Sequence, residues 1–310
     1  MRIAIFGCGA MGSIYAGLLA SGGHDVIAID RNQAHVDAIN TSGLRVSGAS
    51  GDRTVHLRAY TEAPDLSVDL LVIAVKAAFV PAVESARHLV GAGGCVVTIQ
   101  NGLGSADTVA ELFGQEKVIV GVAQGFGASL PEPGHSHHND MKAIRMGRYL
   151  PGSEAPLDPV VAAFAGAGFD TEAVDNIAVI QWEKLICNVA YSGPCALTGM
   201  TVGEVLDDPL IGPVSRAAAV EAWEIARKRD IPIKVDDPEA YVREFAERMR
   251  AAKPSVLLDI EAGRYSEIGV INGAVEKEAG KLGRTAPVNA TITALVRSLE
   301  ERTIGGKAAS

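Results

Sequence analysis

A glycine-rich turn follows directly on an apolar run at the very start of the chain. Ile3–Phe6 is a short run typical of a buried strand, and it leads through Gly7-x-Gly9-x-x-Gly12 into the helical pattern of Met11–Ser21. In such a strand–turn–helix unit the first glycine permits a tight turn. The second leaves room for a pyrophosphate, and the third lets helix and strand pack closely. The phosphates would face N–H groups at the positive end of the helix. The predicted dinucleotide-binding residues are Gly7, Cys8, Gly9, Ala10, Met11 and Gly12.

The residues after the second predicted strand bear on which dinucleotide binds. Asp30 and Arg31 follow Val26–Ile29, where the adenosine ribose should lie. A carboxylate there accepts hydrogen bonds from the ribose hydroxyls of NAD and repels a 2′-phosphate, whereas an arginine attracts that phosphate and favours NADP. The two neighbours argue in opposite directions, so these residues leave NADP and NAD open.

The first half of the chain alternates short apolar runs with helical patterns. The strand candidates are Ile3–Phe6, Val26–Ile29, Leu70–Val75, Cys95–Ile99 and Val118–Val122. Helical stretches such as Ala78–Val90 lie between them, which predicts a doubly wound, Rossmann-type α/β domain with a parallel sheet. Gly125–Gly147 contains turn residues between polar extended segments and predicts an antiparallel hairpin added to the sheet edge. Of its histidines, at 135, 137 and 138, at most two could share a strand face and an ion, so no metal site is predicted.

The second half of the chain lacks strand signals and is predicted to form an all-α domain. Its helical patterns are Ile177–Thr198, Pro209–Arg229, Pro238–Ala252, Ser266–Leu282 and Pro287–Glu301. Several prolines fall at or near the predicted helix starts, where proline is tolerated. We therefore expect a dinucleotide-binding domain over 1–176 and an all-α substrate and catalytic domain over 177–310.

Composition excludes several classes of partner. The formal net charge is −9 and no cluster of lysine and arginine occurs, which argues against nucleic acid as a partner. No apolar stretch approaches the roughly 18 residues of a membrane span. The four cysteines form no C-x-x-C pair and fit buried thiols in a reducing compartment, so we expect a cytoplasmic protein. The apolar second half favours, as a hypothesis, a homodimer.

Two candidate site residues stand just beyond predicted strands, at the edge where open α/β sheets bind ligands. Lys76 follows Leu70–Val75 and is suited to contact a cofactor or an anionic substrate; a surface lysine is the alternative. Asn101 follows Cys95–Ile99 and is suited to bond a cofactor or substrate, although Asn-Gly is also a common turn.

Three polar residues of the second half share one helix face. Lys184, Asn188 and Ser192 recur every four residues within an otherwise apolar helical pattern, so Asn188 and Ser192 are predicted as substrate contacts beside Lys184. Burying a lysine is unfavourable and lowers its pKa toward neutrality, where it can donate a proton; a lysine extending to the surface is the alternative. Glu267 opens a later apolar segment and could partner Lys184, or it is simply a first-turn glutamate favoured by the helix dipole.

At these positions the chain resembles the ketopantoate reductase (2-dehydropantoate 2-reductase) family, from Met1 to about Leu282. The matching motifs are Gly7-x-Gly9-x-x-Gly12, Val75-Lys76-Ala77, Gln100-Asn101-Gly102, Trp182-x-Lys184-x-x-x-Asn188, Ser255 to Asp259, and Glu267-Ile268-x-x-Ile271-Asn272-Gly273. Each motif is short, but their order and spacing together are specific.

The resemblance implies an NADPH-linked reduction of a small 2-oxo acid, ketopantoate to pantoate, in a cleft between two domains. It implies Lys184 as general acid and Glu267 as a contact of the substrate or of Lys184. It also implies substrate contacts for Asn101, Asn188 and Ser255, with Lys76 at the junction of cofactor and substrate. The chain departs from the family pattern at Asp30, Ser192, Gly193 and Gly269.

Two other functions fit parts of the sequence. One is an NAD-linked dehydrogenase of another 2- or 3-hydroxy acid in the same fold, which Asp30 favours. The other is a regulator that binds a dinucleotide without turning it over, which would need a basic or partner-binding element that the sequence lacks. A methyltransferase has a similar glycine-rich loop, but that activity would not explain Lys184 in a buried helix.

Overall fold

A computed structural model describes residues 1–125, 127–140 and 143–305. The chain forms two compact units. The first comprises Met1–Gln100 and Ser105–Ile177, and the second comprises Asn101–Gly104 together with the chain from Ala178 onward.

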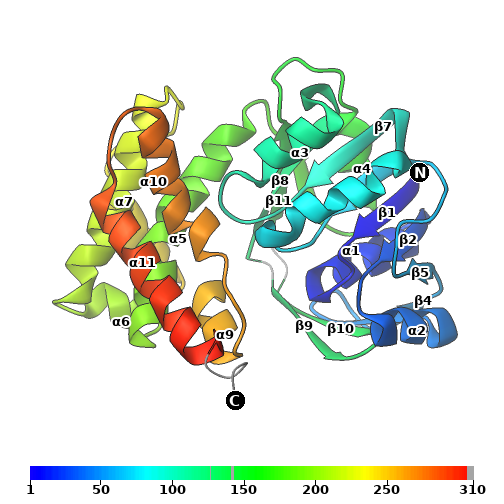
Figure 1. Cartoon of the computed structure of the whole chain (residues 1–310), viewed down its shortest axis with the longest axis horizontal. Helices are drawn as coiled ribbons and strands as arrows, with labels where there is room; N and C mark the ends of the chain where they lie inside the picture. Colours follow the sequence, from blue (N-terminus) through cyan, green and yellow to red (C-terminus); the bar gives the residue numbers. More distant parts are fainter. Residues whose placement is uncertain (126, 141–142, 306–310) are drawn as a thin grey trace. The chain divides into compact units, whose positions relative to one another are not determined.

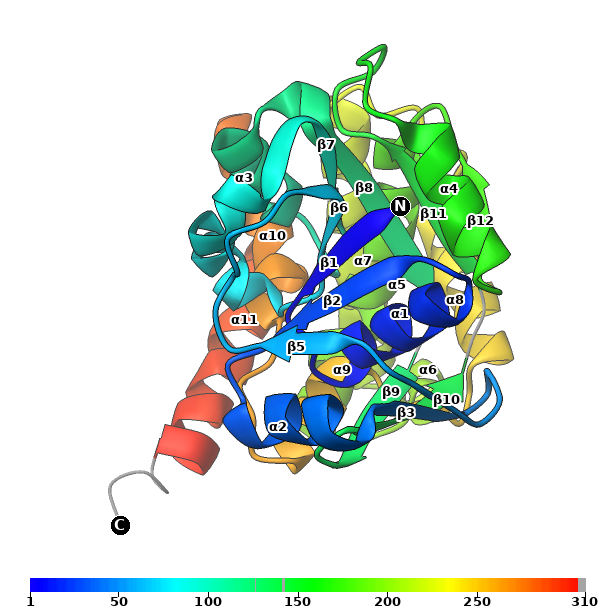
Figure 2. The same ribbon diagram turned by 90° about the vertical axis from the view of Figure 1, so that its right-hand side faces the viewer.

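The first unit is built on an eight-stranded sheet in the order β12-β11-β8-β7-β6-β1-β2-β5. Its strands are β1 Arg2–Phe6, β2 Asp25–Ile29, β5 Arg58–Tyr60, β6 Val68–Ile73, β7 Val90–Thr98, β8 Val118–Gln124, β11 Ala143–Arg148 and β12 Asp170–Ala173. In Figure 2 the strands β7, β6, β1, β2 and β5 can be followed side by side. All pairs are parallel except β11 with β8. The predicted Rossmann-type sheet is therefore confirmed.

The helices of this unit cover the sheet. They are α1 Ala10–Ser21, α2 Gln33–Ser42, the 3₁₀ helix η1 Ala77–Leu89, α3 Ser105–Phe113, the short η2 Gln115–Lys117 and α4 Leu157–Gly166. The last four residues of β6, Leu70–Ile73, are completely buried, as a strand covered on both faces requires. Helices α1 and α4 share a core through Tyr15, Phe164 and Phe169, whose rings lie 5.4–6.2 Å apart.

The predicted hairpin forms, but its predicted place at the edge of the large sheet is wrong. β9 Gly127–Glu132 and β10 His135–Asp140 pair antiparallel within a separate four-stranded sheet with β3 Leu44–Gly48 and β4 Arg53–Val55. One edge of β10 bonds to β3, and the buried Ser136 of β10 bonds to α1. In the large sheet it is β11 that pairs with β8, and β12 forms the edge beyond β11. Of the predicted segment, residues 126, 141 and 142 lie outside the described part of the chain.

The second unit is helical, as predicted. Its helices are α5 Ile177–Thr198, α6 Val202–Asp207, α7 Ile211–Lys228, α8 Pro238–Arg248, α9 Ser255–Glu261, η3 Ile268–Val270, α10 Asn272–Lys281, α11 Pro287–Glu300 and the terminal η4 Glu301–Gly305 (Figure 1). Helix α5 lies in the middle of their core and buries Trp182, Leu185, Ile186 and Val189.

One predicted helix is broken. The pattern Ser266–Leu282 forms η3 and α10 with a bend at Ile271, whose φ and ψ are −101° and −93°. The bend lets the buried side chain of Asn272 donate to the carbonyl of Val189 and to the side chain of Asn289, at 3.0 and 2.9 Å. These side-chain bonds compensate for the helical continuity lost at the break.

A four-residue segment links the end of β7 to the helical unit. Leu103 donates its N–H to the carbonyl of Val270 at 3.0 Å and packs on the helical core. Gly102 adopts φ +75°, and a side chain there would collide with the same carbonyl. The sequence-based division at 176 and 177 differs from the structural units in this segment.

Among the described residues, no helix combines the length and apolar character needed to span a membrane.

Candidate active site

The glycine turn between β1 and α1 leaves open space at one position only. Gly7 has φ +92°, and a Cβ there would collide with Val75; a Cβ on Gly12 would collide with the carbonyl of Gly7. A Cβ on Gly9 would meet nothing within 4 Å. The turn therefore requires glycine at positions 7 and 12 for its own geometry, whereas Gly9 leaves open space of the kind that receives the pyrophosphate in dinucleotide-binding turns.

The start of α1 presents backbone rather than side-chain donors to this space. Gly9 is the N-cap and has no side chain that could satisfy the first N–H groups of the helix. Ala10 and Met11 are half-buried. Cys8 is fully buried, and burial raises the pKa of its thiol to about 12, so it contributes through its backbone. The electrostatics suit an anion at this point.

The two residues predicted to sit beside the ribose differ in exposure. Asp30 is half-buried and accepts a hydrogen bond from the N–H of Asn32 at 2.9 Å. Arg31 is exposed, and its guanidinium lies 4.9 Å from the centre of the Phe79 ring. The ring leaves the guanidinium hydrogens available in its plane, an arrangement that suits a phosphate.

Lys76 is the third residue after the strand, because β6 stops at Ile73, two residues before the predicted end at Val75. It is half-buried and forms the N-cap of η1. Gln100 fixes the backbone just before it by donating to the carbonyls of Ile73 and Val75, at 2.7 and 3.0 Å. The two strand ends, β6 and β7, are thereby joined next to Lys76.

Three of the predicted site residues meet within the helical unit. The ammonium of Lys184 donates to Oδ1 of Asn101 at 2.8 Å, and Nδ2 of Asn101 makes a longer contact of 3.5 Å with Oε2 of Glu267. All three side chains are half-buried. The amide is thus oriented by a donor on one side and an acceptor on the other, and Gly102 fixes its backbone against Val270. Nothing in the sequence signals this role of Gly102 beyond the Asn-Gly pair.

Burial changes the acidity of Lys184. Desolvation lowers the pKa of its ammonium from 10.5 to about 8, and the carboxylate of Glu267 opposes part of that change. A lysine of this kind is still largely protonated at neutral pH and can release its proton far more readily than an exposed lysine. It is therefore suited to serve as a general acid.

The other predicted substrate contacts are placed differently. Asn188 lies one turn along α5 from Lys184 and is half-buried. Ser192 is two turns away, at 4% exposure, which puts its side chain in the helical core. Ser255 is exposed at the first position of α9. The geometry thus groups Lys184, Asn101 and Glu267 most closely.

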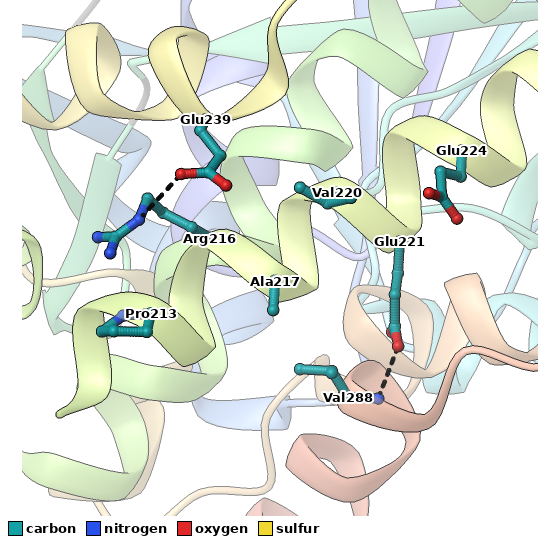
Figure 3. A pocket seen from close by; sticks show the side chains of 8 residues that line it. All are labelled: Pro213, Arg216, Ala217, Val220, Glu221, Glu224, Glu239 and Val288. Carbon is teal, nitrogen blue, oxygen red and sulfur yellow. Dashed lines mark hydrogen bonds and ion pairs between the residues drawn. The ribbon is translucent and has the colours of Figure 1, made fainter.

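A hollow of about 470 Å³ in the helical unit contains none of these residues. Figure 3 shows that α7 supplies most of its lining, with Glu239 of α8 and Val288 of α11 at its rim. Arg216 pairs with Glu239, and Glu221 accepts from the N–H of Val288 at 2.8 Å. These contacts join helices to one another, so we do not assign the hollow to the site.

Comparison with known families covers both units. The family model described as ketopantoate reductase PanE/ApbA matches residues 3–151, and the model of its C-terminal part matches residues 176–300. The chain belongs to the ketopantoate reductase family. A 2-dehydropantoate 2-reductase of Pyrococcus abyssi is 32% identical to it over 97% of this chain and 98% of the relative. One from Archaeoglobus fulgidus is 30% identical over 96% and 98%.

Solved structures of ketopantoate reductases have the same fold. The enzyme of Geobacter metallireducens aligns with a TM-score of 0.88 at 32% identity, covering 96% of this chain and 99% of its own. A family member from Ralstonia eutropha aligns at 0.87 and 30%, covering 98% and 99%. A D-mandelate dehydrogenase bound to NADH and anilino(oxo)acetate aligns at 0.89 but at 24% identity, a likeness of fold alone.

Proposed function

We propose that this ketopantoate reductase family member reduces the carbonyl of a small 2-oxo acid, with 2-dehydropantoate as substrate and NADPH as cofactor. The observation that carries the proposal is the half-buried Lys184 ammonium, oriented by Asn101 beside Glu267. The relatives named 2-dehydropantoate 2-reductase, similar over nearly the whole chain, support the substrate.

In this proposal the glycine turn of Gly7, Gly9 and Gly12 receives the cofactor pyrophosphate, and Lys76 contacts the cofactor near the substrate. When bound, the reduced nicotinamide supplies the hydride that reaches the carbonyl carbon. Lys184 donates a hydrogen bond to the carbonyl oxygen and protonates the alkoxide that forms there. Asn101 holds the ammonium in place, and Glu267 either orients that amide or contacts the substrate. Asn188 and Ser255 are proposed as further substrate contacts, whereas Ser192, whose side chain lies in the helical core, is not.

Initial rates with 2-dehydropantoate and a panel of other 2-oxo acids, each with NADPH and with NADH, test this function. We expect the highest kcat/KM for 2-dehydropantoate with NADPH. A clear preference for another oxo acid with NADH would favour the hydroxy-acid dehydrogenase that Asp30 suggests. Dinucleotide binding without turnover of any acid would contradict the proposed enzyme and favour a regulator.

The pH dependence should follow Lys184. The protonated ammonium is the acid, so kcat/KM for reduction should be level below pH about 8 and fall by about tenfold per unit above it. Because the Glu267 carboxylate raises the pKa of Lys184, Glu267→Gln should move the fall to lower pH. A pH–rate profile of both proteins measures this; an unmoved profile would exclude Glu267 as the neighbour that sets the pKa.

Arg31 is the proposed contact of the NADPH 2′-phosphate. Arg31→Ala should raise the KM for NADPH by about tenfold, the usual effect of losing one charge-assisted hydrogen bond, and leave the KM for NADH nearly unchanged. Arg87→Ala, which removes another exposed arginine from the same unit, is the matched control. Equal losses for both cofactors would contradict a phosphate contact.

A further inference from the structure

A chain of buried hydrogen bonds links the glycine turn to the small sheet. His35 of α2 is 1% exposed and Ser13 of α1 is completely buried. The hydroxyl of Ser13 lies 2.9 Å from the carbonyl of Cys8 and 3.1 Å from Nε2 of His35. On the other side of the imidazole, the N–H of Gly134 donates to Nδ1 at 2.9 Å. Three segments distant in sequence are thus joined through one ring.

The direction of each bond follows from its partners. The N–H of Gly134 can only donate, so Nδ1 of His35 must be unprotonated, and in the neutral ring the proton is then on Nε2. Nε2–H therefore donates to the Ser13 oxygen, and the Ser13 hydroxyl is left to donate to the Cys8 carbonyl. In this series of hydrogen bonds, every donor has an acceptor only while the His35 imidazole is neutral.

The bond to Cys8 acts on the segment that would receive the pyrophosphate. Cys8 lies between Gly7 and Gly9, and Gly9 is the position with open space beside it. A second hydrogen bond joins the small sheet to this segment, because the buried hydroxyl of Ser136 donates to the carbonyl of Ala10 at 2.7 Å. The backbone on both sides of Gly9 is therefore held by hydrogen bonds from Ser13 and Ser136, which lie outside the glycine motif.

We propose that His35 is a positioning residue for dinucleotide binding: through Ser13 it holds the Cys8 backbone in the geometry that accepts the pyrophosphate. This inference rests on the proposed function only in taking the ligand to be a dinucleotide. The role belongs to a residue more than twenty positions beyond the glycine motif, on a helix that the motif does not include.

The surroundings of His35 determine the protonation state of its imidazole, and with it whether this series of hydrogen bonds forms. Burial lowers the pKa of its imidazole below 6.5, while the carboxylate of Asp30 and the Cys8 carbonyl act in the opposite sense. The Cys8 thiol is neutral, since its pKa is about 12. Charged groups on the packed elements bond elsewhere: Asp37 of α2 accepts from Gln33, and Glu132 before Gly134 faces His135 at 3.5 Å. Protonation of Nδ1 would place two donors together at Gly134.

The test is NADH binding, followed by fluorescence, and steady-state kinetics of the full-length protein. His35→Ala and Ser13→Ala should each weaken NADH binding by about tenfold, as expected when a buried polar group loses its partner, with kcat at saturating cofactor within about threefold. The double variant should bind no more weakly than His35→Ala, because both substitutions break one chain. Ser13→Ala changes little volume within a helix and keeps the test open if His35→Ala does not fold.

The matched control is His138→Ala. His138 is also fully buried, and its imidazole contacts Ser50, in the loop between β3 and β4, at 3.1 Å. It should cost stability without weakening NADH binding more than about twofold. NADH carries no group that titrates between pH 5 and 7.5. Burial lowers the pKa of His35, so the affinity for the wild-type protein should fall only at pH values below the ordinary histidine value of about 6.5, and this fall should vanish in His35→Ala.

Folded His35→Ala and Ser13→Ala proteins that bind NADH like the wild type would overturn the proposal, as would equal weakening in His138→Ala. An unchanged pH dependence in His35→Ala would also overturn it. If the wild-type protein binds neither NADH nor NADPH, the proposed function itself fails and this inference falls with it.

Discussion

Lys184→Ala is expected to lower turnover by about 10²–10⁴-fold, the range that general acid catalysis contributes. The variant removes the only group of the Lys184–Asn101–Glu267 cluster that can protonate an alkoxide at neutral pH. NADPH binding should stay within about twofold, because the pyrophosphate is proposed to bind at the glycine turn in the other unit. Stopped-flow or steady-state rates at saturating cofactor, with NADPH fluorescence titration, measure both quantities.

The control for this prediction is another half-buried lysine. Lys117 donates to the carbonyl of Gly91 at 3.1 Å in the first unit, so Lys117→Ala removes a comparable side chain away from the cluster. Its turnover should remain close to the wild-type value. A Lys184→Ala protein that also keeps near wild-type turnover would remove this lysine from the reaction and require another acid.

Gly12→Ala and Gly9→Ala should separate the structural from the ligand-binding use of glycine. A Cβ on Gly12 collides with the backbone carbonyl of Gly7, which cannot move without distorting the turn. We expect a loss of about 1–3 kcal/mol in the free energy of unfolding, together with at least about 100-fold weaker dinucleotide binding. A Cβ on Gly9 meets no protein atom, so Gly9→Ala should fold with near wild-type stability and still bind dinucleotide at least about tenfold more weakly.

Thermal unfolding with and without NADPH distinguishes these outcomes. The wild-type melting temperature should rise with NADPH, since a ligand that binds only the folded state stabilises it. Gly9→Ala should melt like the wild type without ligand and show a smaller rise with it. If Gly9→Ala binds NADPH normally, the open space beside Gly9 does not receive the pyrophosphate.

Some parts of this structure follow from local patterns. The β1–turn–α1 unit can be predicted because each glycine of the turn is required for a distinct steric reason. Helix α5 can be predicted because its apolar residues recur with helical spacing over twenty-two residues. The same spacing predicts that Lys184 and Asn188 share a helix face. Local sequence patterns thus predict the glycine turn and the position of Lys184 on α5.

Other parts depend on pairings that local patterns do not encode. The parallel pairing of β10 with β3 joins residues about ninety positions apart, and β3 and β4 are short, so local patterns do not show which sheet the hairpin joins. Ser192 shares the spacing of Lys184, yet the helices packed around α5 leave it 4% exposed. The meeting of Asn101 with Lys184 and Glu267, and that of His35 with the glycine turn, likewise require the tertiary fold.

The short excursion Asn101–Gly104 makes the peptide chain pass between the two units three times, at residues 100, 104 and 177. A fragment beginning at Ala178 would therefore lack the amide that accepts the Lys184 hydrogen bond, and a fragment ending at Ile177 would carry that amide without the lysine. Chimeras that exchange helical halves between relatives would need to transfer residues 101–104 with them. To keep the Lys184–Asn101–Glu267 cluster intact, a chimera must therefore take two separate segments, residues 101–104 and the chain from Ala178 onward, from the same parent.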